Sequence, residues 1–139
     1  MSNRILLVED EEDIRKTLEE ILVREGFVIE FARDGLEAMH KLEGASFNLI
    51  ILDLMLPKWD GFKICKTIKQ HKLHKDVPVI ILTAMAQDED REKCLSYGVD
   101  EYIKKPFDPD FLLRRIRELL ERPPATDAQS PLSNPSNPS

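Results

Sequence analysis

Short apolar runs alternate along the chain with longer amphipathic stretches. The runs have the length and aliphatic composition of buried strands, and they cover Arg4–Val8, Val28–Ala32, Asn48–Leu52, Val79–Leu82 and Tyr102–Lys104. A helix-length stretch follows each run, over 11–24, from 34 to about 44, after 60–61, over 88–97 and from 108 onward. Apolar residues at helical spacing mark these stretches except 88–97, which Gly98 closes. The alternation predicts an α/β fold, namely a doubly wound five-stranded parallel sheet with flanking helices of the flavodoxin-like (βα)5 type.

Two further signals refine this prediction. The run over 48–52 is almost wholly apolar, which is typical of a strand covered on both faces, so we expect it at the centre of the sheet. Gly26 and Gly98 stand where helices should end, and Asp108-Pro109 is a favourable start for the last helix.

The composition predicts one folded domain followed by a tail. With 139 residues, 42% of them hydrophobic, the chain can bury the core of one ordinary domain, which we place over residues 1–121. Residues 122–139 are rich in Pro, Ser and Asn and contain almost no large apolar side chain. Such a segment cannot offset its ordering entropy by burial, so we expect a disordered tail or a linker stub.

The net charge and the cysteines indicate which classes of binding partner and which cellular compartment the protein has. The net charge of -6 disfavours direct binding to nucleic acid or to anionic membranes and favours proteins and cations. Cys65 and Cys94 lie in helical stretches without metal-ligand spacing, which favours reduced thiols over a disulfide. No signal-peptide pattern precedes the first strand, and no apolar run approaches the roughly 18 residues of a spanning helix. We therefore expect a cytoplasmic protein that does not enter a membrane.

Charged residues follow three of the predicted strands. Glu9-Asp10, Asp53 and Lys105 each come just after an apolar run, at the carboxyl ends where open α/β sheets place their sites. Three neighbouring carboxylates repel one another unless a cation joins them, and Mg²⁺ prefers such oxygen ligands. Solvated charges at a strand end are the better interpretation for any one acid alone, whereas the joint placement favours a Mg²⁺ site.

Asp53 is the candidate nucleophile of this group. It follows four apolar residues and so has a fixed backbone, whereas Glu9 and Asp10 are adjacent and have the character of metal ligands. A carboxylate beside Mg²⁺ can attack phosphorus and form an aspartyl phosphate, while a lysine neutralises the phosphoryl oxygens. Lys105 precedes a proline, and a cis bond there would aim its ammonium at this group, whereas Lys104 points to the other face of the strand.

Four sequence strings carry a resemblance to a known family. They are Leu7-Val8-Glu9-Asp10-Glu11, Leu52-Asp53-Leu54-Met55-Leu56-Pro57 with Asp60-Gly61 following, Leu82-Thr83-Ala84, and Lys104-Lys105-Pro106-Phe107. With these strings in register, the chain resembles the response regulator receiver domain of two-component signalling from residue 4 to about residue 121. Single strings of this kind recur by chance, but four at fitting spacings are very specific.

The resemblance implies a role for each matching residue. Asp53 would accept a phosphoryl group from a sensor histidine kinase or a histidine phosphotransfer protein, and Lys105 would contact the phosphate. Asp10 and Asp53 would bind Mg²⁺ directly, Glu9 would bind it through water, and Met55 would contribute its backbone carbonyl. Such a protein would be no enzyme beyond catalysing its own phosphorylation and dephosphorylation.

The resemblance also implies a switch and an output surface. Thr83 would turn inward to bond a phosphoryl oxygen, and Tyr102 would follow it from an exposed to a buried position. Helix 88–97, the fifth strand and the last helix would then contact a downstream protein. Without the family, Thr83 is simply a strand-end hydroxyl and Tyr102 a half-buried strand residue.

A homodimer through the same surface is a further candidate. In the winged-helix branch of the family, charged residues on this surface form ion pairs across a symmetric dimer, and Arg91, Glu101 and Arg115 stand at matching positions. Phe111 and Ser96 replace two of the partner charges. Only a cross-subunit pair between Glu101 and Arg115 would remain.

Three other classes of protein compete with this interpretation. A haloacid-dehalogenase-type phosphatase would carry a second acid two residues after its nucleophile, where this chain has Met55. A flavodoxin-like electron carrier would have to bind a flavin phosphate at the acidic loop 9–13, which would repel it. A receiver-like interaction module that is never phosphorylated is the remaining alternative, although Asp10, Asp53, Thr83 and Lys105 are all present.

Overall fold

The computed structural model describes residues 3–85 and 87–122 as five alternating strand-helix pairs. In chain order the elements are β1 (Arg4–Val8), α1 (Glu12–Arg24), β2 (Val28–Ala32), α2 (Gly35–Gly44), β3 (Leu49–Leu52), α3 (Gly61–Gln70), β4 (Val79–Thr83), α4 (Asp88–Ser96), β5 (Glu101–Lys104) and α5 (Pro109–Glu121). The predicted five-fold alternation is confirmed, and the bounds that the sequence predicted differ from the observed ones by one residue at most.

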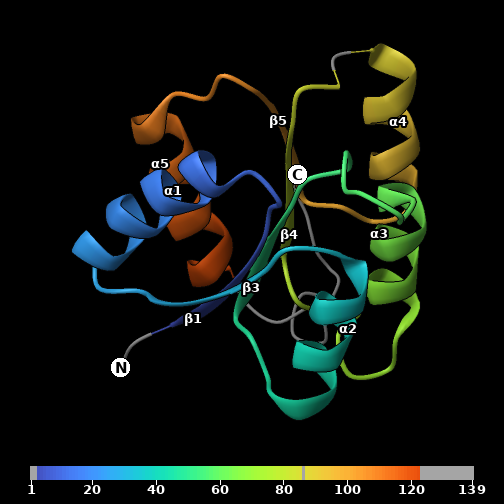
Figure 1. The fold of residues 1–139 in the computed structure, drawn as a ribbon, viewed down its shortest axis with the longest axis horizontal. Helices are drawn as coiled ribbons and strands as arrows, with labels where there is room; N and C mark the ends of the chain where they lie inside the picture. The colour runs from blue at the N-terminus through green and yellow to red at the C-terminus, as the bar shows by residue number, and fades with distance from the viewer. Residues whose placement is uncertain (1–2, 86, 123–139) are drawn as a thin grey trace, which may run out of the picture.

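All five strands are parallel and form one sheet in the order β2-β1-β3-β4-β5. The predicted central strand is indeed β3. Helices α1 and α5 cover one face of the sheet, and α2, α3 and α4 cover the other (Figure 1). The doubly wound fold that the sequence predicted is therefore confirmed.

Alternating side chains of the strands supply a separate core to each layer of helices. From β1, Ile5 and Leu7 pack with α1 and α5, whereas Leu6 and Val8 pack with α2, α3 and α4. Every residue of β3 is buried, as expected for a strand covered on both faces. The sheet is thus a rigid base for the loops that follow its strands.

Aspartate side chains fix the starts of three helices. Asp34, Asp60 and Asp108 are the N-caps of α2, α3 and α5, and each carboxylate accepts a hydrogen bond from a backbone amide of the first turn. Gly26 and Gly98 follow α1 and α4 with positive φ angles of 94° and 97°. The helices therefore begin and end at the capping residues and glycines that the sequence predicted.

The two cysteines are free and lie in the core, Cys65 on α3 and Cys94 on α4. A hydrogen bond with the Cys94 thiol, together with burial, raises the pKa of the Cys65 thiol, so it stays protonated. Both behave as small apolar core residues.

The described part of the chain ends just after α5. Arg122, which we assigned to the tail, is the C-cap of α5, and its guanidinium lies 2.8 Å from Oδ1 of Asp100. The predicted disordered tail otherwise falls on residues 123–139, which lie outside the described residues. Among the described helices, none combines the length and the apolar character that crossing a membrane requires.

Candidate functional site

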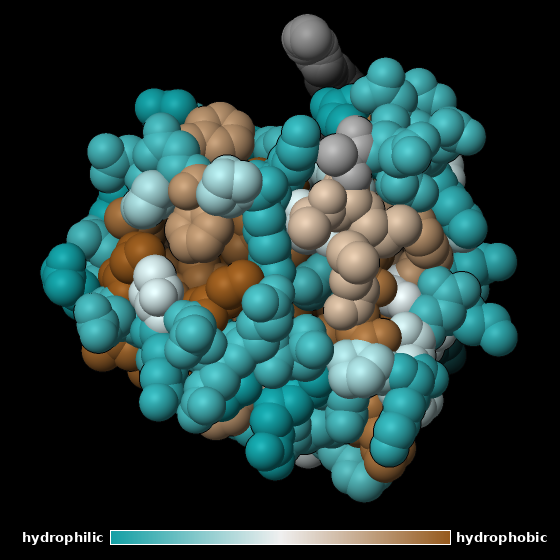
Figure 2. Space-filling model, turned by 45° about the horizontal axis from the view of Figure 1, so that its top comes forward, coloured by the Kyte–Doolittle hydropathy of each residue, from teal (hydrophilic) through white to brown (hydrophobic). Residues whose placement is uncertain are grey.

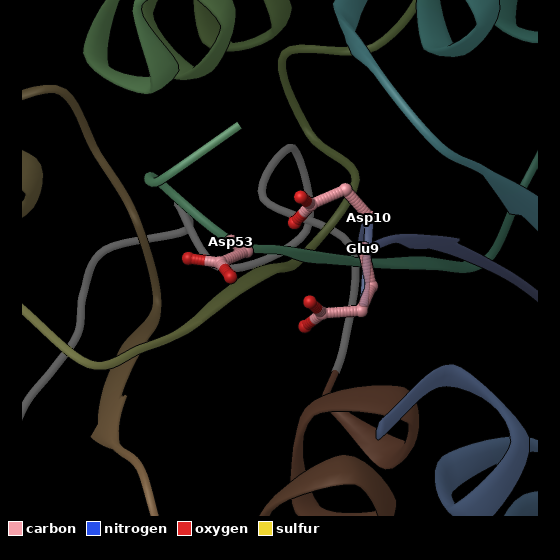
Figure 3. Close-up of side chains that lie close together, drawn as sticks. All are labelled: Glu9, Asp10 and Asp53. Atoms are coloured by element: carbon pink, nitrogen blue, oxygen red, sulfur yellow. The ribbon is translucent and has the colours of Figure 1, made fainter. Parts of the chain in front are cut away.

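Strand pairing brings the three acidic residues together. Val8 at the end of β1 lies beside Leu52 at the end of β3, and the amide of Asp53 donates to the Val8 carbonyl at 3.1 Å. Glu9 and Asp10 therefore leave the sheet next to Asp53. Figure 3 shows the carboxylates of Glu9 and Asp10 turned toward the side on which Asp53 lies.

These carboxylates form a compact cluster of oxygen ligands. One oxygen from each of Glu9, Asp10 and Asp53 lies within 4.8 Å of the others. Glu9 is only 1% exposed and Asp53 only 4%, whereas Asp10 is open to solvent. Buried carboxylates this close repel one another, and a hard divalent cation that prefers oxygen and keeps some of its water fits the donor set. The residues present therefore suit Mg²⁺.

Lys105 reaches into the same cluster from the loop after β5. Its ammonium lies 2.8 Å from Oδ2 of Asp53, 2.8 Å from Oε1 of Glu9 and 3.8 Å from Glu11. The amide of Lys105 donates to the Thr83 carbonyl at 2.8 Å, and the peptide bond to Pro106 is cis, as the sequence allowed. Lys104 is exposed, so the two adjacent lysines separate as predicted.

The pKa values of the buried pair have distinct physical causes. Burial raises the pKa of Glu9, and its hydrogen bond to Lys105 offsets only part of this effect. Burial also disfavours the Lys105 ammonium, but hydrogen bonds to Asp53 and Glu9 outweigh it and raise the pKa of Lys105. Lys105 is therefore positively charged beside these carboxylates. An additional cation would further stabilise the ionised form of Glu9.

Thr83 and Tyr102 meet at one residue of the loop after β4. Thr83 is fully buried, and its Oγ1 accepts a hydrogen bond from the Met85 amide at 3.4 Å. The half-buried Tyr102 donates its hydroxyl to the Met85 carbonyl at 2.7 Å, and burial raises the pKa of Tyr102 to about 12. Sequence reasoning missed Met85, because its part is played by backbone atoms and has no side-chain signal.

The loop after β3 forms another border of the site. The Met55 amide donates to Oδ1 of Asp53 at 2.9 Å, so this peptide lies against the carboxylate. The Met55 side chain is 56% exposed. Figure 2, which tilts the carboxyl edge of the sheet toward the viewer, shows apolar surface interrupting an otherwise hydrophilic face.

Trp59 in the same loop packs onto the start of α2. A Cβ on Gly35 would lie 2.6 Å from Cδ2 of Trp59, so the indole occupies the space that the glycine leaves open. Trp59 itself is 40% exposed. Its role in this structure is packing between the loop and the helix.

The chain matches the model of one protein family and resembles several known proteins. The family is the response regulator receiver domain, matched over residues 5–117. Response regulator ArlR of Staphylococcus aureus is 42% identical over 124 residues, which cover 89% of this chain and 55% of that protein. The chain thus spans about half the length of the curated relatives it matches.

Solved structures show the same fold. A putative response regulator from Chloroflexus aurantiacus superposes with a TM-score of 0.83 at 30% identity, covering 88% of this chain and all of that one. The receiver domain of a sensor histidine kinase from Pseudomonas aeruginosa, with a magnesium ion coordinated in its active-site cleft, gives 0.80 at 32% identity with the same coverage. From the family match, the fold and the clustered acids, we conclude that the chain belongs to the response regulator receiver domain family.

Proposed function

We propose that this domain accepts a phosphoryl group on Asp53 in a Mg²⁺-dependent reaction. The observation that carries the proposal is the position of the Asp53 carboxylate, which is buried, 2.8 Å from the Lys105 ammonium and clustered with Glu9 and Asp10. The donor is a phosphohistidine of a sensor histidine kinase or of a histidine phosphotransfer protein, consistent with membership of the family.

The reaction is a transfer between two nucleophiles. A carboxylate oxygen of Asp53 attacks phosphorus, the new O–P bond forms as the P–N bond breaks, and the histidine nitrogen leaves with the electron pair. Lys105 stabilises the negative charge on the transferring group. When bound, Mg²⁺ would neutralise further charge there, held by Asp10, Asp53 and the Met55 carbonyl and, through water, by Glu9.

The aspartyl phosphate would then act as a switch. Its oxygens can accept hydrogen bonds from the Thr83 hydroxyl and from the Ala84 amide. The Thr83 oxygen also accepts from the Met85 amide, so a displacement of Thr83 would be passed to this loop. Tyr102 holds the Met85 carbonyl, so it must respond when this loop moves. The signal would leave through the surface of α4, β5 and α5 to a downstream protein.

The domain would carry out no chemistry on other substrates. Met55 offers no acid or amide side chain to orient a water molecule, so we expect slow loss of the phosphoryl group.

Free thiols at Cys65 and Cys94 are consistent with a reducing cytoplasm.

Intact-mass spectrometry after incubation with acetyl phosphate and Mg²⁺ tests the proposal. We expect the mass of one phosphoryl group to be added to the wild-type protein, and none to be added to Asp53→Asn or in the presence of EDTA. Asp60→Asn is the matched control, because Asp60 lies in the same loop but only caps α3. A wild-type protein that gains no adduct would instead support an interaction module that is never phosphorylated.

A further inference from the structure

An unusually basic segment runs along α3 and the loop that follows it. Residues 61–75 contain five lysines and two histidines but no aspartate or glutamate, in a chain whose net charge is -6. Lys69 pairs with Asp100 at 3.5 Å. The other four lysines are exposed, and no carboxylate among residues 3–85 and 87–122 lies within 4.0 Å of them: Lys63, Lys66, Lys72 and Lys75.

An apolar cavity lies beside the loop that carries Lys72 and Lys75, between the carboxyl ends of α2 and α3. Its volume is about 230 Å³. The lining residues are Met39, Leu42 and Glu43 from α2, Thr67 and Ile68 from α3, and His71, Leu73 and His74 from the following loop. Leu73 is 78% exposed at its rim, an uncommon position for a leucine between two basic residues. Sites for cofactors and drug-sized ligands measure roughly 300–1,000 Å³, so this cavity is better suited to a side chain.

We propose that this basic groove, defined as the cavity together with Lys72 and Lys75, binds an acidic protein segment. One large apolar side chain of the segment would enter the cavity against Leu73, and flanking carboxylates would face the lysines. Among the described residues that line the cavity, Glu43 is the only acid, and it lies on the α2 side. The carboxylates of the partner would therefore lie over the loop that follows α3.

The chemistry of the groove favours a protein over other polyanions. Nucleic acid has no aliphatic side chain to fill the cavity, whereas a protein segment supplies both carboxylates and such a side chain. The apolar side chains Ile64, Cys65 and Ile68 of α3 are already buried in the core, which leaves Leu73 as the apolar group of this segment available for insertion.

The basic groove lies at the opposite end of the molecule from Asp53. Asp53 follows a strand at the carboxyl edge of the sheet, whereas α2 and α3 end at the amino edge, the lower edge in Figure 1. The described residues that line its cavity come from α2, α3 and the following loop, and none comes from α4, β5 or α5. A partner side chain in the cavity would therefore leave the phosphoryl site free.

Titration of the ¹⁵N-labelled protein with synthetic peptides tests this proposal. The probe is a glutamate-rich peptide with a single central leucine, and the controls replace that leucine by serine or every glutamate by lysine. We expect amide shifts confined to residues 39–43 and 63–75, and affinity that falls at least tenfold for either control peptide. Affinity should also fall as salt is added, because the contact is partly ionic.

Two sets of variants make the result decisive. Lys72→Gln combined with Lys75→Gln, or Leu73→Ser alone, should weaken binding about tenfold, whereas Lys16→Gln combined with Lys104→Gln should not change it. These control lysines are exposed on other surfaces. The proposal is overturned if the peptide shifts residues elsewhere, if duplex DNA or anionic vesicles bind the groove more tightly than the peptide, or if light scattering shows that the groove joins two copies of the chain.

Discussion

The ammonium of Lys105 lies 2.8 Å from Oδ2 of Asp53 and at the same distance from Oε1 of Glu9. One buried cation therefore joins acids that follow two different strands. It neutralises part of the charge in the cluster and positions the Asp53 carboxylate.

Removing this cation should destabilise the metal-free protein. We expect Lys105→Ala to lower the free energy of unfolding by about 3 kcal/mol, because two buried carboxylates lose their partner. Mg²⁺ should restore much of the loss by binding the folded state. Urea unfolding with and without Mg²⁺ measures both effects. Lys104→Ala, at the exposed neighbour, should change stability by less than about 0.5 kcal/mol, and equal losses for the two variants would contradict the interpretation.

The raised pKa of Glu9 predicts a specific dependence of stability on pH. The folded state binds the proton of Glu9 more tightly than the unfolded state, so this contribution is fully present below the ordinary pKa of glutamate. It is lost as the pH rises through the raised value. Without Mg²⁺, Glu9→Gln should therefore gain stability relative to wild type as the pH increases across that window.

Unfolding titrations of wild type and Glu9→Gln at a series of pH values check this sign. Glu12→Gln, at an exposed position in α1, should follow the wild-type profile. Adding Mg²⁺ should stabilise wild type more than Glu9→Gln, since the cation favours the ionised carboxylate. A Glu9→Gln curve parallel to wild type would show that burial of this acid has no such effect.

The contact between Trp59 and Gly35 can be tested within one helix. Gly35→Ala would place a methyl group 2.6 Å from Trp59 and 2.8 Å from Ile64, so we expect a loss of about 1–3 kcal/mol. The emission of Trp59, the only tryptophan, should shift to longer wavelength as the indole is displaced. Gly44→Ala is the control, because no atom lies within 4 Å of that added carbon. Similar spectra and stabilities for both variants would contradict this packing.

Arg115 forms ion pairs with two glutamates of its own chain. Its Nε lies 2.6 Å from Oε1 of Glu101, and its Nη1 lies 2.6 Å from Glu118. A cross-subunit pair between Glu101 and Arg115 would first have to break these bonds. The hydrogen bond to Glu118 outweighs partial burial and, with the bond to Glu101, raises the pKa of Arg115.

We therefore expect Arg115→Gln to affect stability modestly and assembly not at all. Partly exposed ion pairs contribute about 0.2–1 kcal/mol, so urea unfolding should show a loss in that range. Light scattering with beryllofluoride and Mg²⁺ should give the same molar mass for variant and wild type. If beryllofluoride dimerises only the wild type, the result would instead support an ion pair between Glu101 and Arg115 across two subunits.

Strand composition allowed most of the site to be predicted. The β3 run is apolar throughout and the β1 run is apolar after Arg4, so their carboxyl ends were clear. Glu9, Asp10 and Asp53 had to emerge at one edge if the strands were parallel neighbours. The start of β5 was harder to place, because Glu101 becomes part of a strand only through its pairing with Ile80. A charged residue gives no local signal for such pairing.

The amino-acid sequence alone determined the order of elements, the parallel sheet and the residues at the carboxyl edge, because burial on both faces demands uninterrupted apolar runs. Only the tertiary structure decided that Lys105 contacts Glu9 as well as Asp53, that Thr83 and Tyr102 meet at Met85, and that Arg115 pairs within the chain. These contacts depend on how side chains and backbone atoms from distant segments meet. Local periodicity carries no information about that geometry.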